Sequence, residues 1–225
     1  MIQLETATLS KDFVIVTTDK PTRGRPRRFD LDLAIATAQS LFHARGYDDV
    51  SVADLTKAFG INPPSFYAAF GSKAQLYRSV LDRYAMTGAI PLLEILGTRQ
   101  PLAVSLAQVL EQAARAYAAD PSATGCMVLE GTRCNDVEAR EAACTFHVAA
   151  QDVIKNIIAE RYPQEADRLA DYVSTTMAGL SASARHGQSL DRLLASAQLA
   201  SVALAQAIPA ECEEDAGSSA AARER

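Results

Sequence analysis

The 225-residue sequence has few of the residues and none of the short motifs that mark catalytic or metal centres. It contains three scattered histidines and four cysteines, none of them in a Cys-x-x-Cys pair. This pattern disfavours a structural zinc site and a disulfide framework. A Gly-x-Ser-x-Gly elbow, a glycine-rich phosphate loop and a His-Glu-x-x-His sequence are also missing. We therefore expect no enzyme, no bound metal and no cofactor.

The sequence also lacks long apolar segments. No apolar run approaches the length of about eighteen residues that a transmembrane helix needs, so no membrane partner is expected. Residues 1–19 carry Lys11 as their single positive charge and no sustained apolar core, which disfavours a secretory signal. Hydrophobic residues make up 48% of the chain, which is ample for a core. The cytoplasm is the expected location.

Charge is unevenly distributed along the chain. The net charge of −5 by itself disfavours DNA as a partner. However, residues 20–83 hold ten Lys and Arg against six Asp and Glu, whereas residues 84–225 hold eleven against eighteen. A basic amino-terminal region on an acidic remainder is typical of a DNA reader with a separate regulatory body.

Residues 51–70 have the pattern of a helix-turn-helix motif. Ser51 is a good N-cap, and Asp54 three residues later can complete a capping box. Gly60 ends this first helix, Asn62 caps a second one that opens with a proline pair, and Gly71 ends it. Two short helices joined by a tight glycine turn can place the second helix in a DNA major groove.

Residues 25–84 also resemble the DNA-binding domain of the TetR family of transcriptional regulators. The family pattern runs from an LF-x-x-x-G-[YF] phrase through [ST]-[VI]-x-x-[IL] to Y-x-x-F-x-[SN]-K-x-x-[LI]. The matching residues here are Leu41, Phe42, Gly46, Tyr47, Ser51, Val52, Leu55, Tyr67, Phe70, Ser72, Lys73 and Leu76. The resemblance implies an all-α fold, with an amino-terminal three-helix DNA-binding domain joined to a helical bundle that binds an effector and dimerises.

Candidate DNA contacts divide into residues that position the protein on the DNA backbone and residues that recognise bases. Arginines of the basic arm before the motif are expected to follow phosphates or enter the minor groove; alternatively, the arm is only a solvated leader. Asn62 and Ser65 are the polar candidates for base contact, although both could merely cap their helix. The arm residues are Arg23, Arg25, Arg27 and Arg28; the phosphate candidates are Ser51, Tyr67 and Lys73; the base candidates are Asn62, Pro64, Ser65 and Ala68.

The helical pattern predicts about nine helices, and the chain divides into four regions. These are a flexible arm (1–24), the DNA-binding domain (25–86), a helical effector-binding and dimerisation domain (87–210) and a disordered tail (211–225). Asp30 is expected to cap the first helix, with His43 and Arg45 solvated near its end. The buried stripe of that helix is predicted to be Leu33, Ala34, Ala38, Leu41 and Phe42.

The second half of the chain suggests a dimer interface and an effector pocket. The last two helices, rich in Ala, Ser, Leu and Gly, could form a four-helix interface between two subunits or be buried in one core. The apolar and small residues of the last helix are too many to lie on one face of it: Leu193, Leu194, Ala197, Val202 and Ala205. The pocket candidates, which could equally be core residues, are Tyr84, Tyr117, Cys126, Met127, Glu130, Phe146 and His147.

By resemblance, the chain is expected to be a homodimeric repressor that binds a palindromic operator of double-stranded DNA and is released by an unknown small-molecule effector. Such release would follow if the effector moved the fourth helix and changed the spacing of the two recognition helices. The alternative is a thiol-responsive DNA-binding regulator, because Cys126, Cys134 and Cys144 lie close together in the sequence. That alternative requires an exposed thiol of low pKa.

Overall fold

The computed structural model describes residues 29–208. Over this range the chain is all helical, with no strand, and all its helices belong to one compact unit that begins at Leu31. In chain order they are α1 (Leu31–Arg45), α2 (Val52–Phe59), α3 (Pro63–Phe70), α4 (Lys73–Thr87), α5 (Leu92–Leu96), α6 (Leu102–Tyr117), α7 (Met127–Gly131), α8 (Val137–Arg161), α9 (Ala166–Arg185) and α10 (Leu190–Ala207). None of these helices is long and apolar enough to cross a membrane.

The caps predicted for the helix-turn-helix are present. Ser51 Oγ accepts from the Asp54 amide at 3.1 Å, and the Asp54 carboxylate accepts from the Ser51 amide at 2.9 Å, which completes the capping box of α2. Gly60 ends α2 with a φ of 68°, in the left-handed region that glycine adopts without strain. Asn62 Oδ1 accepts from the Ser65 amide at 2.9 Å at the start of α3. Local hydrogen bonds therefore set the limits of both helices.

An aromatic core holds α1–α4 together and continues into α7 and α8. The Phe42 ring lies 5.1 Å from Tyr77 and 5.7 Å from Tyr47 between ring centroids. Met127 and Ala143, from α7 and α8, belong to the same buried cluster. Gly131 permits this close approach, because a Cβ there would lie 2.4 Å from the Tyr77 hydroxyl. The helices that carry the motif thus share one core with part of the body.

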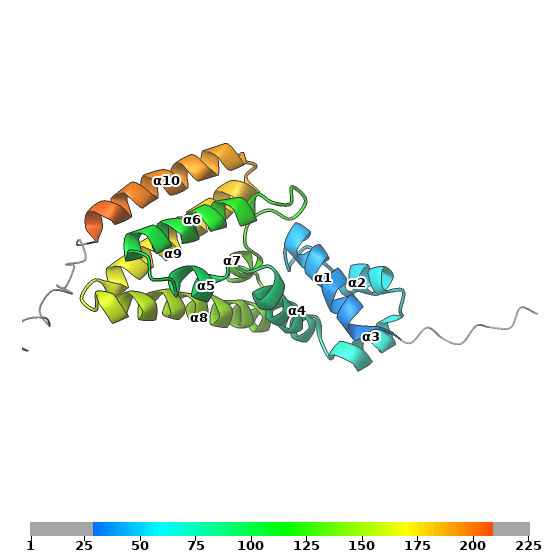
Figure 1. Cartoon of the computed structure of the whole chain (residues 1–225). Coiled ribbons are helices and arrows are strands. Elements are labelled where there is room, and N and C mark those ends of the chain that lie inside the picture. Colours follow the sequence, from blue (N-terminus) through cyan, green and yellow to red (C-terminus); the bar gives the residue numbers. More distant parts are fainter. Residues whose placement is uncertain (1–28, 209–225) are drawn as a thin grey trace, which may run out of the picture. The chain divides into compact units, whose positions relative to one another are not determined.

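A second core lies among α6, α9, α10 and the carboxyl-terminal half of α8 (Figure 1). Leu106 and Leu110 of α6, Ile158 of α8 and Leu193 of α10 are completely buried in it. α10 packs mainly on α6, with additional contacts to α9. These long helices form the framework behind the cavity described below.

The predicted architecture is confirmed, but several details differ. Leu33, assigned to the buried stripe of α1, is 66% exposed, because the stripe is formed by Ala34, Ala38 and Phe42. α5, which follows Pro91, was not predicted, since five residues are too few to reveal a helical period. Ser189, whose residue type suits a helix N-cap, precedes α10 but makes no side-chain capping hydrogen bond.

Candidate DNA-binding interface and effector cavity

The second helix of the motif, α3, presents an exposed face without charged side chains. Phe66 is fully buried, and its ring centroid lies 5.4 Å from that of Phe70 and 6.5 Å from that of Phe59. This packing turns the other side of α3 to solvent. The base-contact candidates on that exposed side are Asn62, Pro64, Ser65 and Ala68.

Two of the predicted contact groups are already used within the protein. The Ser51 hydroxyl donates to Asp54 Oδ2 at 2.6 Å, so it is engaged in the capping box. This bonding, from the Ser51 hydroxyl and then its amide, lowers the pKa of the Asp54 carboxyl to about 2. The Asn62 oxygen is likewise engaged as a cap, which leaves its NH₂ group and the Ser65 hydroxyl as the polar groups on the face.

The predicted phosphate contacts Tyr67 and Lys73 lie in different settings. Tyr67 is 53% exposed, and its ring lies edge-on to that of Phe66, with 5.4 Å between the ring centroids. The Lys73 ammonium lies 3.9 Å from the centroid of the Tyr47 ring, at the first residue of α4. Burial lowers the pKa of Lys73, while Asp48 and Asp136 act in the opposite direction. Tyr47, which matched only as part of the family pattern, thus lies directly beneath Lys73 in the fold.

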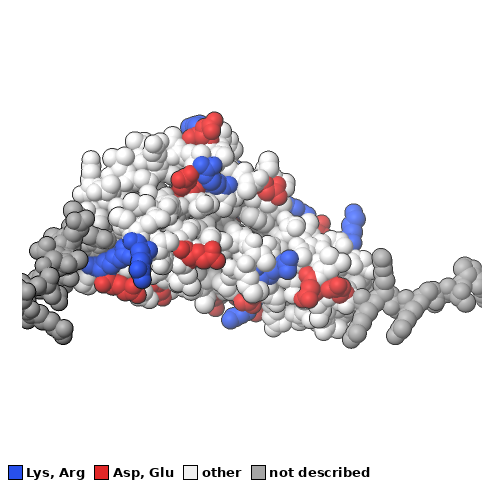
Figure 2. All heavy atoms as spheres, in the orientation of Figure 1, with Lys and Arg blue, Asp and Glu red and all other residues white. Residues whose placement is uncertain are grey.

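Positive charge is concentrated in the arm rather than in the helices. Arg23, Arg25, Arg27 and Arg28 lie outside the described residues. Between residues 29 and 83 the sequence holds five Lys and Arg against six Asp and Glu, so the basic excess of the amino-terminal region comes entirely from residues 20–28. On the face shown in Figure 2, basic and acidic side chains are interspersed over a largely uncharged surface. Electrostatic attraction to DNA would therefore depend on the arm.

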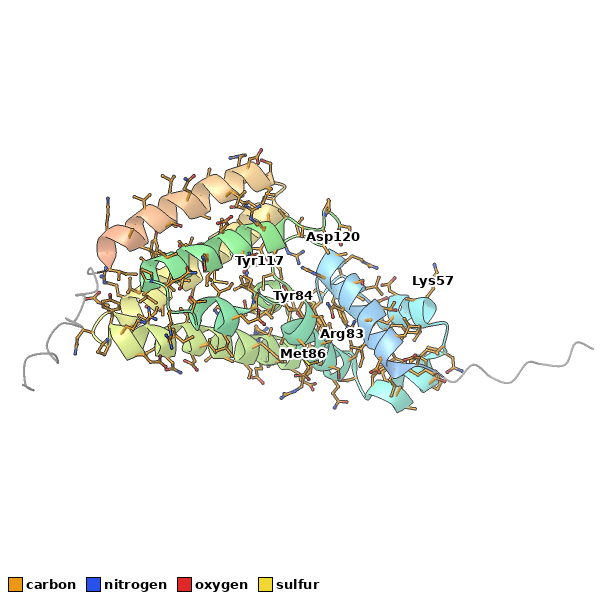
Figure 3. All side chains as sticks on the ribbon, viewed as in Figure 1. Lys57, Arg83, Tyr84, Met86, Tyr117 and Asp120 are labelled. Carbon is orange, nitrogen blue, oxygen red and sulfur yellow. The ribbon has the colours of Figure 1, made fainter. Side chains whose placement is uncertain are left out.

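A cavity of about 530 Å³ lies in the body, bordered by α4, α5, α6, α7, α8 and α9. This volume falls within the range of roughly 300–1,000 Å³ that is usual for small-molecule sites. Figure 3 labels three of its wall residues, Tyr84 and Met86 on α4 and Tyr117 on α6. Most of the wall is apolar, and many of its side chains also belong to the two cores.

Five of the seven predicted pocket residues line this cavity, namely Tyr84, Tyr117, Cys126, Phe146 and His147. Met127 does not line it, because its side chain is buried in the aromatic core. Glu130 does not line it either and instead lies 3.5 Å from Arg185 and 3.7 Å from Arg133. Sequence reasoning missed the wall contributed by the end of α4 and by α5, including Met86, Ile90 and Leu93, because a short helix and its loops have no recognisable period.

The ionisable groups in the deeper part of the wall are held neutral. Burial raises the pKa of the Tyr84 and Tyr117 phenols, and the nearby Cys126 side chain acts in the same direction on both. Burial likewise raises the pKa of the Cys126 thiol and lowers that of His147. These groups offer hydrogen bonds but no charge at neutral pH.

A set of contacts joins the cavity wall to α1 of the DNA-binding region. The His43 ring lies edge-on to Tyr84, with 5.6 Å between centroids, and His43 Nε2 lies 3.0 Å from the Gly125 carbonyl oxygen. Arg185 of α9 donates to the His43 carbonyl at 3.1 Å. Gly125 adopts a φ of 78°, and a Cβ there would lie 2.9 Å from Arg185 Cγ. His43 is therefore partly buried, contrary to the expectation that it is solvated; only the fold reveals this role.

A second set of contacts lies at the loop after α1. The Tyr47 hydroxyl donates to the Asp136 carboxylate at 2.9 Å, and the Asn135 amide donates to Asp48 at 3.0 Å. Asp136 is also the N-cap of α8. The DNA-binding region is thus attached to the body through the end of α1 and through the loop that follows it.

The two helices predicted to form a dimer interface have one covered and one uncovered face. Leu193 and Ala197 of α10 are buried against the body, whereas Leu199 is 75% and Val202 53% exposed. On α9, Gly179 is exposed, and a Cβ at this position would meet nothing within 4 Å. Apolar and small side chains therefore remain uncovered in the single chain.

Two of the described thiols, those of Cys126 and Cys134, lack the low pKa that a thiol sensor requires. Burial raises the pKa of Cys134 as it does that of Cys126, which reduces the thiolate fraction that oxidation requires. Cys126, Cys134 and Cys144 are all free. Between residues 29 and 208, no three His, Cys, Asp or Glu side chains form a group that could hold a metal ion.

Comparisons with known proteins agree with this architecture. Residues 34–80 match the bacterial regulatory proteins, tetR family. The chain is 49% identical over 181 residues to the HTH-type transcriptional repressor BdcR of Escherichia coli K12, an alignment that covers 80% of this chain and 92% of BdcR. It is 30% identical over 186 residues to the repressor ComR of the same organism, covering 78% of this chain and 89% of ComR.

A solved structure gives a similar result at the level of the fold. A cysteine mutant of the TetR family transcriptional regulator CifR, complexed with 26 bp double-strand operator DNA, is 30% identical to this chain. The superposition has a TM-score of 0.72 and covers 80% of this chain and 99% of the CifR chain.

Proposed function

Because the chain belongs to the TetR family of bacterial transcriptional regulators, we propose that it is a repressor that binds a palindromic operator as a homodimer and is released by a small molecule. The chain is a DNA-binding regulator of transcription, and its relatives BdcR and ComR are named as repressors. The palindrome, the dimer and the effector are our proposals for this protein.

The reading surface of the proposed complex is the exposed face of α3. The Ser65 hydroxyl and the Asn62 NH₂ group would contact base edges, and Pro64 and Ala68 would approach thymine methyl groups. Lys73 and Tyr67 would contact phosphates, and the arginines of the arm would add affinity that does not depend on sequence. Two copies of α3 would lie in successive major grooves, about 34–36 Å apart.

The proposed dimer interface is the uncovered face of α9 and α10. Leu199 and Val202 provide exposed apolar area on α10, and Gly179 provides a flat site on α9 where another helix can approach closely. An isologous interface of this kind gives the two-fold symmetry that a palindrome requires.

The observation that carries the effector proposal is the continuous contact from the cavity to α1. Tyr84 forms part of the cavity wall and packs against His43, while Gly125, the partner of His43, precedes the wall residue Cys126. A ligand that displaces Tyr84 or Cys126 would disturb His43, and with it the position of the DNA-binding region. This would couple the cavity to the separation of the two recognition helices.

Fluorescence anisotropy tests the DNA-binding part of the proposal. The full-length protein is titrated onto DNA flanking its own gene and onto scrambled DNA, across a series of salt concentrations. We expect a preference of ~10³-fold or more for the flanking DNA, with affinity that falls steeply with salt. Equal affinity for both DNAs would show that the operator does not lie next to the gene.

A further inference from the structure

The cavity wall restricts the chemistry of the molecule that can occupy it. We propose that the ligand is neutral and mainly apolar and carries a hydroxyl or carbonyl group that bonds to Ser174. This inference rests on the proposed effector function, because it specifies the chemistry of the same cavity.

The first observation is the absence of positive charge from the wall. No Lys or Arg is among the described residues that line the cavity. Its single carboxylate belongs to Glu94, which is exposed on α5. A carboxylate or phosphate inside the cavity would lose its hydration without gaining a counter-charge, which is strongly unfavourable.

The second observation is that the other ionisable groups of the wall stay neutral. Burial raises the pKa of the Tyr84 and Tyr117 phenols and of the Cys126 thiol, and the nearby Cys126 side chain raises the pKa of both phenols further. All three groups are therefore uncharged at neutral pH and offer no counter-charge to an ion. A buried cation would find no deep carboxylate, because Glu94 lies at the exposed part of the wall.

The third observation is an unpartnered hydroxyl in the wall. Ser174, on α9, is 8% exposed, and its Oγ atom has no hydrogen-bond partner within the protein. A buried hydroxyl without a partner costs free energy, so a ligand group that pairs with it gains this amount on binding. Ser174 Oγ exposes less than 1 Å² of surface, so the side chain has to turn about its Cα–Cβ bond toward the cavity to meet a ligand. A hydroxyl or carbonyl oxygen can then pair with it without bringing charge into the cavity.

Three probes of equal chain length test the proposal by calorimetric titration of the full-length protein at neutral pH: decan-1-ol, decanoate and decylammonium. We expect decan-1-ol to bind at least about tenfold more tightly than either ion, because only the ions lose charge hydration. Equal or tighter binding of decanoate or decylammonium would overturn the proposal, and so would failure of all three to bind.

Two substitutions locate the site of binding. Ser174→Ala is expected to weaken decan-1-ol binding by about three- to tenfold, as the loss of one hydrogen bond predicts. Ser183→Ala, in the same helix but not in the cavity wall, serves as the matched control. An equal effect of the two substitutions would exclude the assigned role of Ser174.

A third substitution tests the argument from charge. Met177 is a partly buried wall residue, and Met177→Lys would place a positive charge in the cavity, whereas Met177→Gln would match its length without charge. We expect Met177→Lys to shift the preference toward decanoate and Met177→Gln to leave it unchanged; an unchanged preference in a folded Met177→Lys protein would contradict the argument. Operator affinity is measured separately by anisotropy, so failure of the ligand proposal remains distinguishable from failure of DNA binding.

Discussion

The exposed face of α3 and the wall of the cavity are both almost uncharged, but they are built in different ways. α3 is placed by local caps and by one buried ring, Phe66, so its exposed residues have no part in the core. The cavity wall is assembled from segments between Tyr84 and Met177, and many of its residues also stabilise the body. DNA reading can therefore be separated from stability by substitution, whereas the cavity and the fold are harder to separate.

The largest effect is expected where α3 meets the core. Phe66→Ala should lower the free energy of unfolding by about 3–5 kcal/mol, as expected for removal of a completely buried phenylalanine. Ser65→Ala, one residue earlier and exposed, should change it by less than about 0.5 kcal/mol. Urea denaturation followed by circular dichroism measures both. Similar losses for the two variants would mean that the exposed face is not independent of the core.

The next largest effect is expected on the dissociation constant of the proposed dimer. Leu199→Glu would place a charge in the proposed dimer interface and should weaken dimerisation by about a hundredfold or more, because a buried unpaired carboxylate costs several kcal/mol. Gln112→Glu adds the same charge at an exposed position of α6, outside the proposed interface, and serves as the control. Sedimentation velocity over a range of concentrations gives the dissociation constants. A dimer unaffected by Leu199→Glu would place the interface elsewhere.

Lys73 tests the part of the DNA-binding surface that contacts phosphates and positions the protein, rather than the part that recognises bases. Lys73→Ala should weaken binding to all DNA sequences and reduce the slope of log affinity against log salt by about one. Lys155→Ala removes an equal charge from the body, where Lys155 pairs with Asp167, and should leave the slope unchanged. Anisotropy titrations on operator and scrambled DNA supply the slopes. A loss confined to the operator would assign Lys73 a reading role instead.

His43 tests the link between the two regions through pH. Burial lowers the pKa of His43 below its usual value of 6.5. As the pH falls toward this value, the unfolded chain binds more protons than the folded chain, so the free energy of unfolding decreases. His147, whose pKa is also lowered, contributes with the same sign. His43→Gln should therefore remove part of the decrease in unfolding free energy between about pH 7.5 and about pH 5.5.

The control for this measurement is His186→Gln, at an exposed position after α9. Urea denaturation at several pH values gives the pH dependence of each protein. If His43→Gln retained the full dependence of the parent protein, His147 or other groups would account for it.

The smallest effect is expected for the reading group itself. Ser65→Ala should change the preference between operator variants by about tenfold or less, corresponding to roughly 1 kcal/mol, because a serine makes at most a single contact with a base edge. Competition anisotropy with operators altered one base pair at a time measures this preference. Equal weakening on every sequence would reduce Ser65 to a structural residue of α3.

The sequence by itself determined the helix-turn-helix and the family. The caps at Ser51 and Asn62 and the turn at Gly60 are short-range features, so a reader of the sequence can recognise them without knowing the fold. The helical period also identified most helices of the body. It misassigned Leu33, because a helical period does not say which apolar residues a neighbouring helix covers.

Only the tertiary structure decided how the cavity and its link to α1 are formed. Seven pocket residues were predicted from their types, and five of them line the cavity. Met127 and Glu130 face other partners, and α5 was not expected. The link from His43 to Gly125 spans 82 positions in the sequence, and that from Arg185 to His43 spans 142. Contacts between residues so far apart depend on how whole helices pack, and no local pattern encodes them.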